Sequence, residues 1–280
     1  MKLKKVCIVG LGLLGSSIGK ALKSKGLADC VYGVVRKENY IDKAIDMGII
    51  DAGSLDIKQG VCDADFIILA VPVKTVLKYI DILSELDIGN TIVTDVGSTK
   101  LDIVNLAEKK LVNFVGSHPM TGSEKFGMDF ADENLYKNKL CILTETYKTN
   151  EEYLQKVEEF WEELGSYTKI VTPEKHDKVL AEISHLPHLT AVSLVNSVDE
   201  EFIEFAASGF CDITRIASGS AVMWNDICES NTENIIKAIE VLQENLNDIK
   251  DKLQNKDCKG ILEFLENAKQ KRDKLIELKR

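Results

Sequence analysis

The sequence predicts an α/β fold, in which a doubly wound parallel sheet occupies residues 1–172 and an all-α region occupies residues 173–280. Three observations predict it: short apolar runs alternate with amphipathic stretches, a glycine-rich turn follows the first run, and strand-like runs stop near Thr172. Nearly continuous apolar strands are typical of a parallel sheet that is covered by helices on both faces.

Each strand of the predicted sheet is a short apolar run. The expected strands span residues 6–9, 31–35, 66–71, 91–95, 113–115, 140–143 and 167–171. The stretches between them carry apolar residues at helical spacing, which predicts helices over residues 16–25, 40–47, 74–84, 99–110 and 151–164. Strands that alternate with helices in this way pair in parallel through right-handed crossovers.

The chain after Thr172 has almost no strand signal and is expected to be helical to its end. Thr172 followed by Pro173 is a strong helix start, because threonine caps the first turn and proline fits its first position. Pro187 should kink this helix, since it cannot donate to the carbonyl of Ile183. Long helices over residues 232–280 carry an apolar stripe that so short a region cannot easily bury, so we expect a homodimer through these helices.

Composition and charge exclude several classes of protein. The 280 residues allow about two domains, and 45 acidic against 35 basic residues give a net charge of −10. No basic stripe appears, which argues against nucleic acid or an anionic membrane surface as a partner. The seven cysteines form no CxxC pair, and no apolar run reaches the roughly 18 residues of a membrane span, so we expect reduced thiols in a cytoplasmic protein.

A glycine-rich turn, GLGLLG, joins the first expected strand to the first helix. The first glycine permits the tight turn, the second lets the backbone approach a pyrophosphate, and the third lets helix and strand pack closely. Free N–H groups at the helix start then meet the phosphates. We therefore predict a Rossmann-type dinucleotide site, with a purely structural turn as the alternative, formed by Gly10, Gly12, Leu13, Leu14 and Gly15.

The end of the second strand bears on which dinucleotide is bound. NAD sites usually place Asp or Glu there to accept a hydrogen bond from the ribose. Here Val35 is followed by Arg36 and Lys37, two cations suited to a 2′-phosphate, which slightly favours NADP or dual use over NAD alone. A solvated pair of loop residues is the alternative. Val71 and Pro72 end a later strand at the edge where a nicotinamide could lie.

Two polar residues that follow expected strands are candidates for catalysis. His118 lies in a long irregular stretch, residues 116–139, and could accept a proton from a substrate hydroxyl as hydride leaves. A buried structural histidine explains His118 equally well. Ser98 follows the strand over residues 91–95, and taken alone it would be interpreted as a helix cap.

The helical half contributes further candidates near the expected kink. His185 and His188 are three residues apart, but no third ligand is evident nearby, so we expect no metal and leave anion binding or packing open. Arg215 lies in a stretch of low charge and needs an anionic partner, which is either a ligand or a buried Asp212 or Asp226.

Together these motifs resemble the prephenate/arogenate dehydrogenase family of tyrosine biosynthesis, and most closely its monofunctional prephenate dehydrogenases. The resemblance covers nearly the whole chain, through GLGLLG, DVGSTK, GSHPMTGSEK, SHLPH, DITRIA and MWNDI in that order. It implies oxidative decarboxylation of prephenate to 4-hydroxyphenylpyruvate, with hydride transfer to NAD(P)+. Aromatisation makes this step strongly downhill, so the protein must supply orientation, a hydroxyl acceptor and sites for two carboxylates.

The resemblance also implies a role for each matching residue. His118 would polarise the substrate hydroxyl, and Ser98 would hold that hydroxyl and the imidazole in register. Arg215 would bind the ring carboxylate, and His188 would contact the side-chain carboxylate, which favours prephenate over arogenate. Glu124 and Ser184 would form an entrance gate. His185 and Trp224 would form the wall of the pocket.

Departures from the family and alternatives to it remain. Cys211 replaces a lysine found in some relatives, so the role of that position is in doubt. Because the chain starts at the first strand and ends soon after the helices, we expect no fused chorismate mutase and no ACT domain. The alternatives are an arogenate dehydrogenase, a non-catalytic NAD(P)-binding sensor, and a 3-hydroxyacid or ketopantoate-type NADP-dependent dehydrogenase. The last would need a catalytic lysine, for which the helix after Thr172 offers only Lys175 and Lys178.

Overall fold

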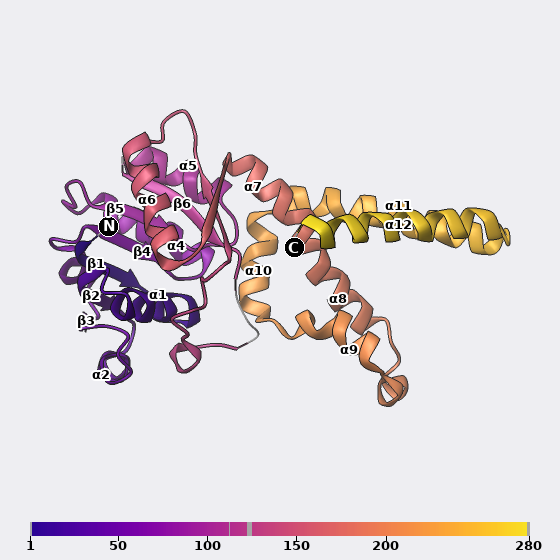
Figure 1. Ribbon diagram of the computed structural model, residues 1–280, viewed down its shortest axis with the longest axis horizontal. Helices are drawn as coiled ribbons and strands as arrows, with labels where there is room; N and C mark the ends of the chain where they lie inside the picture. Colours follow the sequence, from indigo (N-terminus) through magenta and orange to yellow (C-terminus); the bar gives the residue numbers. More distant parts are fainter. Residues whose placement is uncertain (1, 112, 122–124, 279–280) are drawn as a thin grey trace. The chain divides into compact units, whose positions relative to one another are not determined.

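The structure, a computed structural model, describes residues 2–111, 113–121 and 125–278 (Figure 1). It confirms an α/β region followed by helices. The chain forms two compact units, Met1–Thr232 and Glu233–Arg280, and each is described by itself. This division lies later than the predicted domain boundary at Thr172, where the strands end, and that boundary stays a prediction.

The first unit contains one eight-stranded sheet in the order β3-β2-β1-β4-β5-β6-β7-β8. Its strands are β1 Leu3–Val9, β2 Ala28–Val34, β3 Ala52–Ser54, β4 Phe66–Leu69, β5 Ile92–Asp95, β6 Phe114–Pro119, β7 Leu140–Thr144 and β8 Tyr167–Val171. The first six are parallel to one another, β7 is antiparallel to β6, and β8 is parallel to β7. The sheet is therefore mostly parallel, rather than wholly parallel as predicted. The difference arises because the apolar pattern that locates a strand in the sequence carries no information about its direction.

Helices cover both faces of this sheet. They are α1 Leu13–Ser24, α2 Asn39–Asp46, α3 Ile57–Val61, α4 Val73–Ser84, α5 Leu101–Lys110 and α6 Glu151–Leu164. Alternate residues of β1 enter two separate cores: Val6 and Ile8 pack with α1 and α6, whereas Cys7 and Val9 pack with α3, α4 and α5. The doubly wound arrangement places the carboxyl ends of β1, β4, β5 and β6 along one edge.

Strand β6 extends further than the sequence indicates. It continues through Pro119, so His118 lies within a strand and pairs with Ile142 of β7 rather than in an irregular stretch. The partner strand begins about twenty residues later in the chain, and no local pattern predicts that it returns to this edge.

The helices after β8 begin as predicted. They are α7 Pro173–Leu180, a π-helical turn Ala181–His185, α8 Leu186–Asn196, a 3-10 turn Glu200–Phe205, α9 Ser208–Thr214, a 3-10 turn Arg215–Ser218 and α10 Ala221–Ser230. The Thr172 hydroxyl accepts a hydrogen bond from the Lys175 N–H at 3.3 Å, which confirms the predicted cap. The π-helical turn ends at His185, two residues before Pro187, so the helix is distorted where this proline predicted a kink.

The second unit consists almost entirely of two long helices, α11 Thr232–Gln254 and α12 Cys258–Leu278, joined by a short turn (Figure 1). Large apolar side chains remain exposed on both helices, namely Ile236, Val241, Leu246, Leu253, Leu262, Leu265, Leu275 and Ile276. Among the described residues, no helix combines the length and the apolar character that crossing a bilayer requires.

Candidate active site

The glycine-rich turn after β1 requires glycine for two different reasons. Gly10 has φ +95°, and a Cβ on it would lie 2.5 Å from the carbonyl oxygen of Ala70. A Cβ on Gly15 would lie 2.1 Å from the carbonyl oxygen of Gly10. Gly12 has no atom within 4 Å of its Cβ position, and the first turn of α1 has no acidic side chain. This turn fits the pyrophosphate of a dinucleotide, because its open backbone at Gly12 lies at the N-terminal end of α1, where the helix dipole is positive.

A cavity of about 430 Å³ extends from this turn along the carboxyl edge of the sheet. Gly12, Leu13 and Leu14 line one end of it, and the segment Ala70 to Val73, which contains Val71 and Pro72, lines its wall. Ser98 and His118 also line this cavity. The predicted cofactor residues around the glycine turn and after β4 therefore share one cavity with the two predicted catalytic residues.

A second cavity, of about 410 Å³, lies between the sheet edge and the helices after β8. Ser184, His185 and Trp224 line it, together with Lys139 and Met120. Five residues line both cavities: Ser98, His118, Thr121, Met223 and Ile227. A molecule in one cavity would thus meet a molecule in the other at Ser98 and His118.

His118 is buried and belongs to a hydrogen-bonded chain of side chains. Its Nδ1 lies 2.9 Å from Nε2 of His176, and Nδ1 of His176 lies 2.7 Å from Oδ1 of Asp177. Burial lowers the pKa of His118 well below its usual value, and the neighbouring His176 and Lys100 add to this effect. His118 is therefore neutral at physiological pH, so one of its ring nitrogens carries a lone pair.

The loop that carries Ser98 is held by a fully buried ion pair. The ammonium of Lys100 lies 2.6 Å from Oδ2 of Asp95 and also donates to the carbonyl of Gly97 at 2.7 Å. Asp95 in turn accepts from the N–H groups of Gly97 and Ser117, at 2.7 and 3.1 Å. The ion pair therefore fastens this loop to β6 directly beside His118. Helix α5 begins at Leu101 with Lys100 at its N-cap, so Ser98 does not cap it.

The two histidines near the π-helical turn pack against Trp224. The ring of His188 stacks on the indole with ring centres 3.5 Å apart, and the ring of His185 meets it edge-on at 6.0 Å. Burial lowers the pKa of His188, and a hydrogen bond to the backbone of Ile216 opposes this shift. In the described part of the chain, no three His, Cys, Asp or Glu side chains are placed to bind a metal ion.

Other predicted site residues lie outside these cavities. Arg215 is exposed at the start of its 3-10 turn and lines neither cavity. Arg36 and Lys37 are exposed after β2, whereas Val35 is buried. The charge of Arg36 opposes the rise in the pKa of Tyr79 that burial causes, so the guanidinium lies close to this residue of α4. Glu124 lies outside the described residues.

Sequence reasoning missed the residues that support the cavity histidines. His176, Asp177 and Asn231 stand outside every motif. Asp95 and Lys100 lie within DVGSTK, but their pairing was not predicted. One signal was present in the composition, since the chain has only four histidines. In the structure His118 contacts His176, and both His185 and His188 contact Trp224. Which side chains they contact depends on packing between segments far apart in the sequence.

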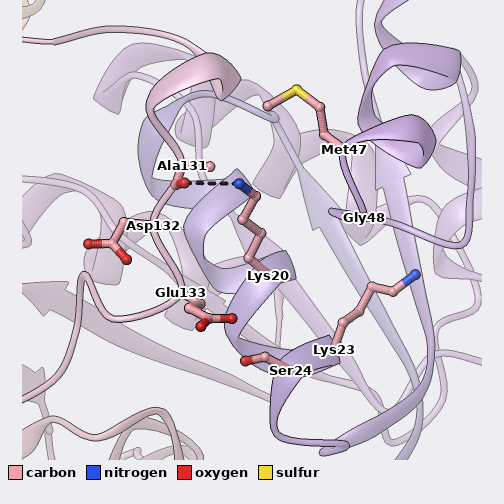
Figure 2. Close-up of a pocket in the computed structure, with 8 residues that line it drawn as sticks. All are labelled: Lys20, Lys23, Ser24, Met47, Gly48, Ala131, Asp132 and Glu133. Carbon is pink, nitrogen blue, oxygen red and sulfur yellow. Dashed lines mark hydrogen bonds between the residues drawn. The ribbon is translucent and has the colours of Figure 1, made fainter.

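A separate open groove of about 600 Å³ lies along the second half of α1 (Figure 2). Lys20, Lys23, Asp132 and Glu133 line it, and the ammonium of Lys20 donates to the carbonyl of Ala131 at 3.1 Å. Lys20 and Lys23 are roughly 10–15 Å along the helix from Leu13, at 1.5 Å per residue. This groove therefore does not belong to the dinucleotide cavity.

The fold and these two cavities define a dinucleotide-binding oxidoreductase with a helical region after the nucleotide-binding sheet. Residues 18–170 match the prephenate dehydrogenase nucleotide-binding domain, and residues 172–267 match the prephenate dehydrogenase dimerization domain. The chain belongs to the prephenate dehydrogenase family.

Individual relatives agree with this assignment. The chain is 36% identical to the prephenate dehydrogenase of Lactococcus lactis over 282 residues, which cover 95% of this chain and 76% of that protein. It superposes with a TM-score of 0.92 on prephenate dehydrogenase from A. aeolicus in complex with hydroxyphenyl propionate and NAD+, at 36% identity and over 98% and 99% of the two chains. Synechocystis arogenate dehydrogenase superposes with a TM-score of 0.84 at 28% identity, over 97% and 99%.

Proposed function

We propose that this protein oxidatively decarboxylates prephenate to 4-hydroxyphenylpyruvate in tyrosine biosynthesis, with hydride transfer to NAD(P)+. Membership of the prephenate dehydrogenase family supports this reaction. The observation that carries it is the meeting of two cavities at Ser98 and His118, one extending from the dinucleotide turn and the other lined by helical residues. When bound, the nicotinamide supplies the hydride acceptor.

In this proposal, His118 accepts the proton of the substrate hydroxyl, because it is neutral and lines both cavities. Ser98 holds the hydroxyl and the imidazole in register. His185 and Trp224 form the wall of the substrate cavity with Ser184, and His188 orients a substrate carboxylate from its stack on Trp224.

The same proposal assigns dinucleotide binding to the glycine turn, Val71 and Pro72. It also gives the cofactor as NADP, or as either NADP or NAD. Arg36 and Lys37 support the second point, since both are exposed beside the end of β2, where a 2′-phosphate would lie. The A. aeolicus relative was crystallised with NAD+, so the assay must include both dinucleotides.

Replacing Arg36 should separate the two dinucleotides. We expect Arg36→Ala to raise KM for NADP by about 10-fold or more, because a charge-assisted contact with phosphate is lost, and to leave KM for NAD within about twofold. Lys43→Ala is the control, since this partly exposed lysine of α2 pairs with Asp129 instead. Equal changes in the two KM values would refute the 2′-phosphate site.

The reaction itself is tested by an absorbance assay for reduced nicotinamide. Prephenate and arogenate are each combined with NAD and with NADP, which gives four progress curves. We expect activity with prephenate. Arogenate is the second candidate substrate because an arogenate dehydrogenase shares the fold closely. Four flat curves would contradict the proposal.

We assign the ring carboxylate of the substrate to Arg215, although this residue is exposed in the structure. The 3-10 turn that begins at Arg215 contacts His188 through the backbone of Ile216, so Arg215 is adjacent in sequence to a residue that contacts this histidine. From the resemblance to the family, Glu124 and Ser184 are proposed to gate the entrance of the active site.

Arg215→Ala should raise KM for prephenate by about 10-fold or more, because a carboxylate loses its charged partner. Arg272→Ala serves as the control, since that arginine is an exposed residue of α12. Steady-state kinetics with saturating dinucleotide measure the effect. An unchanged KM in the Arg215 variant would assign this arginine to the fold rather than to the substrate.

We further propose that the protein is a homodimer in which the C-terminal helices take part. Residues 172–267 match a dimerization domain, and α11 and α12 expose apolar side chains that a partner subunit would cover.

A further inference from the structure

Asp177 is a buried residue of α7 that is linked to the two cavity histidines, His118 and His185, through intermediate side chains. Its carboxylate contacts His176, and its backbone carbonyl contacts Asn231. Its carboxylate accepts from the N–H groups of Lys100 and Leu101, at 2.7 and 3.0 Å. Nδ1 of His176 lies 2.7 Å from the same carboxylate. Both oxygens of the Asp177 carboxylate accept backbone hydrogen bonds, as an ionised carboxylate does. The carboxylate therefore also accepts from His176, which carries its proton on Nδ1.

This proton determines which nitrogen of His118 is free. Burial lowers the pKa of His176 to about 2, helped by the charge of Lys100, so His176 is neutral and its Nε2 is unprotonated. Nε2 of His176 must then accept from Nδ1 of His118, 2.9 Å away. Because His118 is neutral as well, its own Nε2 carries a lone pair and no proton.

The backbone carbonyl of Asp177 acts on the other histidine through Asn231. The side-chain amide nitrogen of Asn231 lies 2.7 Å from this carbonyl oxygen, which can only accept, so the amide presents its NH2 group there. The same nitrogen lies 3.2 Å from Nδ1 of His185 and donates its second hydrogen to it. His185 therefore carries its proton on Nε2.

The Nε2 atom of His185 is buried, and it has no hydrogen-bond partner among the residues that the structure describes. Burial lowers the pKa of His185 to about 4, so the ring is neutral at physiological pH. Its N–H group is an unused donor in a residue that lines the second cavity. A buried donor without a partner costs free energy, and a substrate oxygen would supply the missing acceptor.

We propose that Asp177 imposes opposite tautomers on two cavity histidines, so that His118 presents an acceptor and His185 presents a donor. The inference rests on the proposed function. His118 accepts the hydroxyl proton at Nε2, and His185 donates from Nε2 to a carboxylate or keto oxygen of the substrate. His176 and Asn231 are positioning residues that transmit the effect of Asp177.

The proton balance follows from these tautomers. The hydroxyl O–H proton moves to Nε2 of His118 while hydride leaves the same carbon for the dinucleotide. The electron pair of the C–C bond that breaks to release carbon dioxide enters the ring. The proton then returns to the phenolic oxygen, so the histidine is regenerated and no net proton is consumed.

The tautomers can be observed directly by nitrogen NMR of the intact protein labelled with 15N-histidine. Because the chain has only four histidines, single His→Gln variants assign every imidazole signal. At neutral pH we expect His118 and His176 to be protonated on Nδ1 and His185 on Nε2. A proton on Nε2 of His118, or on Nδ1 of His185, would overturn the proposal.

Kinetics provide a second test. His176→Phe removes the acceptor for Nδ1 of His118, so we expect kcat to fall by about 10-fold or more with KM nearly unchanged. His176→Gln should recover most of this loss, because its side-chain oxygen can accept the same hydrogen bond. Equal kcat values in the two variants would contradict the role of His176.

The Asn231 arm should affect binding rather than turnover. Asn231→Leu removes the donor to His185, and we expect a rise in KM for prephenate of about threefold or more with kcat preserved, as for one weakened hydrogen bond. If a variant fails to fold, the NMR measurement on the unmodified chain still decides. An inactive chain with the expected tautomers would refute only the proposed function, and an active chain with the other tautomers would refute only this inference.

Discussion

His118→Asn should lower kcat for prephenate by about 100-fold or more, while substrate KM and dinucleotide affinity stay within about twofold. The asparagine side chain still forms hydrogen bonds but cannot accept the hydroxyl proton at the required position. The imidazole is buried at the junction of both cavities and is neutral at physiological pH, so it is the described side chain best placed to act as the base. Ser98, which lines the same junction, remains protonated in this pH range and cannot replace it.

Steady-state kinetics measure kcat and KM for this variant, and fluorescence titration measures its dinucleotide affinity. Unchanged dinucleotide affinity shows that the neighbouring glycine turn has kept its structure. Near-normal turnover would remove His118 from the chemical step. A rise in KM with constant kcat would make it a binding residue only.

Lys100→Met should destabilise the first unit by about 3–5 kcal/mol, because the substitution leaves Asp95 as an uncompensated buried charge. Both side chains of this ion pair are completely buried. Burial already raises the pKa of Asp95, against the opposing effect of Lys100, so the carboxylate depends on this ammonium for its charge. The loss would be a large part of the 5–15 kcal/mol that typically stabilises a domain.

Urea unfolding followed by tryptophan fluorescence measures this effect. Trp224 is replaced by phenylalanine in every variant, so that the signal comes from Trp161 alone, which is buried in the core of the sheet region. Lys110→Met is the matched control. It removes a lysine from the far end of α5 whose pair with Asp81 is 41% and 51% exposed, and we expect no measurable change. Similar stabilities for the two variants would mean that the buried pair contributes little.

The glycine turn could be predicted from the sequence because its pattern is local: Gly10, Gly12 and Gly15 stand at a fixed spacing between an apolar strand and a helix. The structure adds the steric reasons, since a Cβ on Gly15 would meet Gly10 and a Cβ on Gly10 would meet Ala70, which follows β4. Five of the six parallel strands were predicted for a similar reason, since burial on both faces leaves a continuous apolar run. The sixth, β3 Ala52–Ser54, was missed because this three-residue strand has no apolar run. The reversed direction of β7 was not predicted either, because strand direction depends on which edge the chain returns to.

The sequence by itself determined the fold class, the dinucleotide turn, the family and the identity of His118 as the candidate base. These follow from short motifs and from their order along the chain. Only the tertiary structure decided how His118 can function. His176 and Asp177 come from α7 and Asn231 follows α10, whereas His118 lies on β6. A hydrogen bond requires its two atoms to lie within about 3 Å of each other, and for residues tens of positions apart only packing sets that distance.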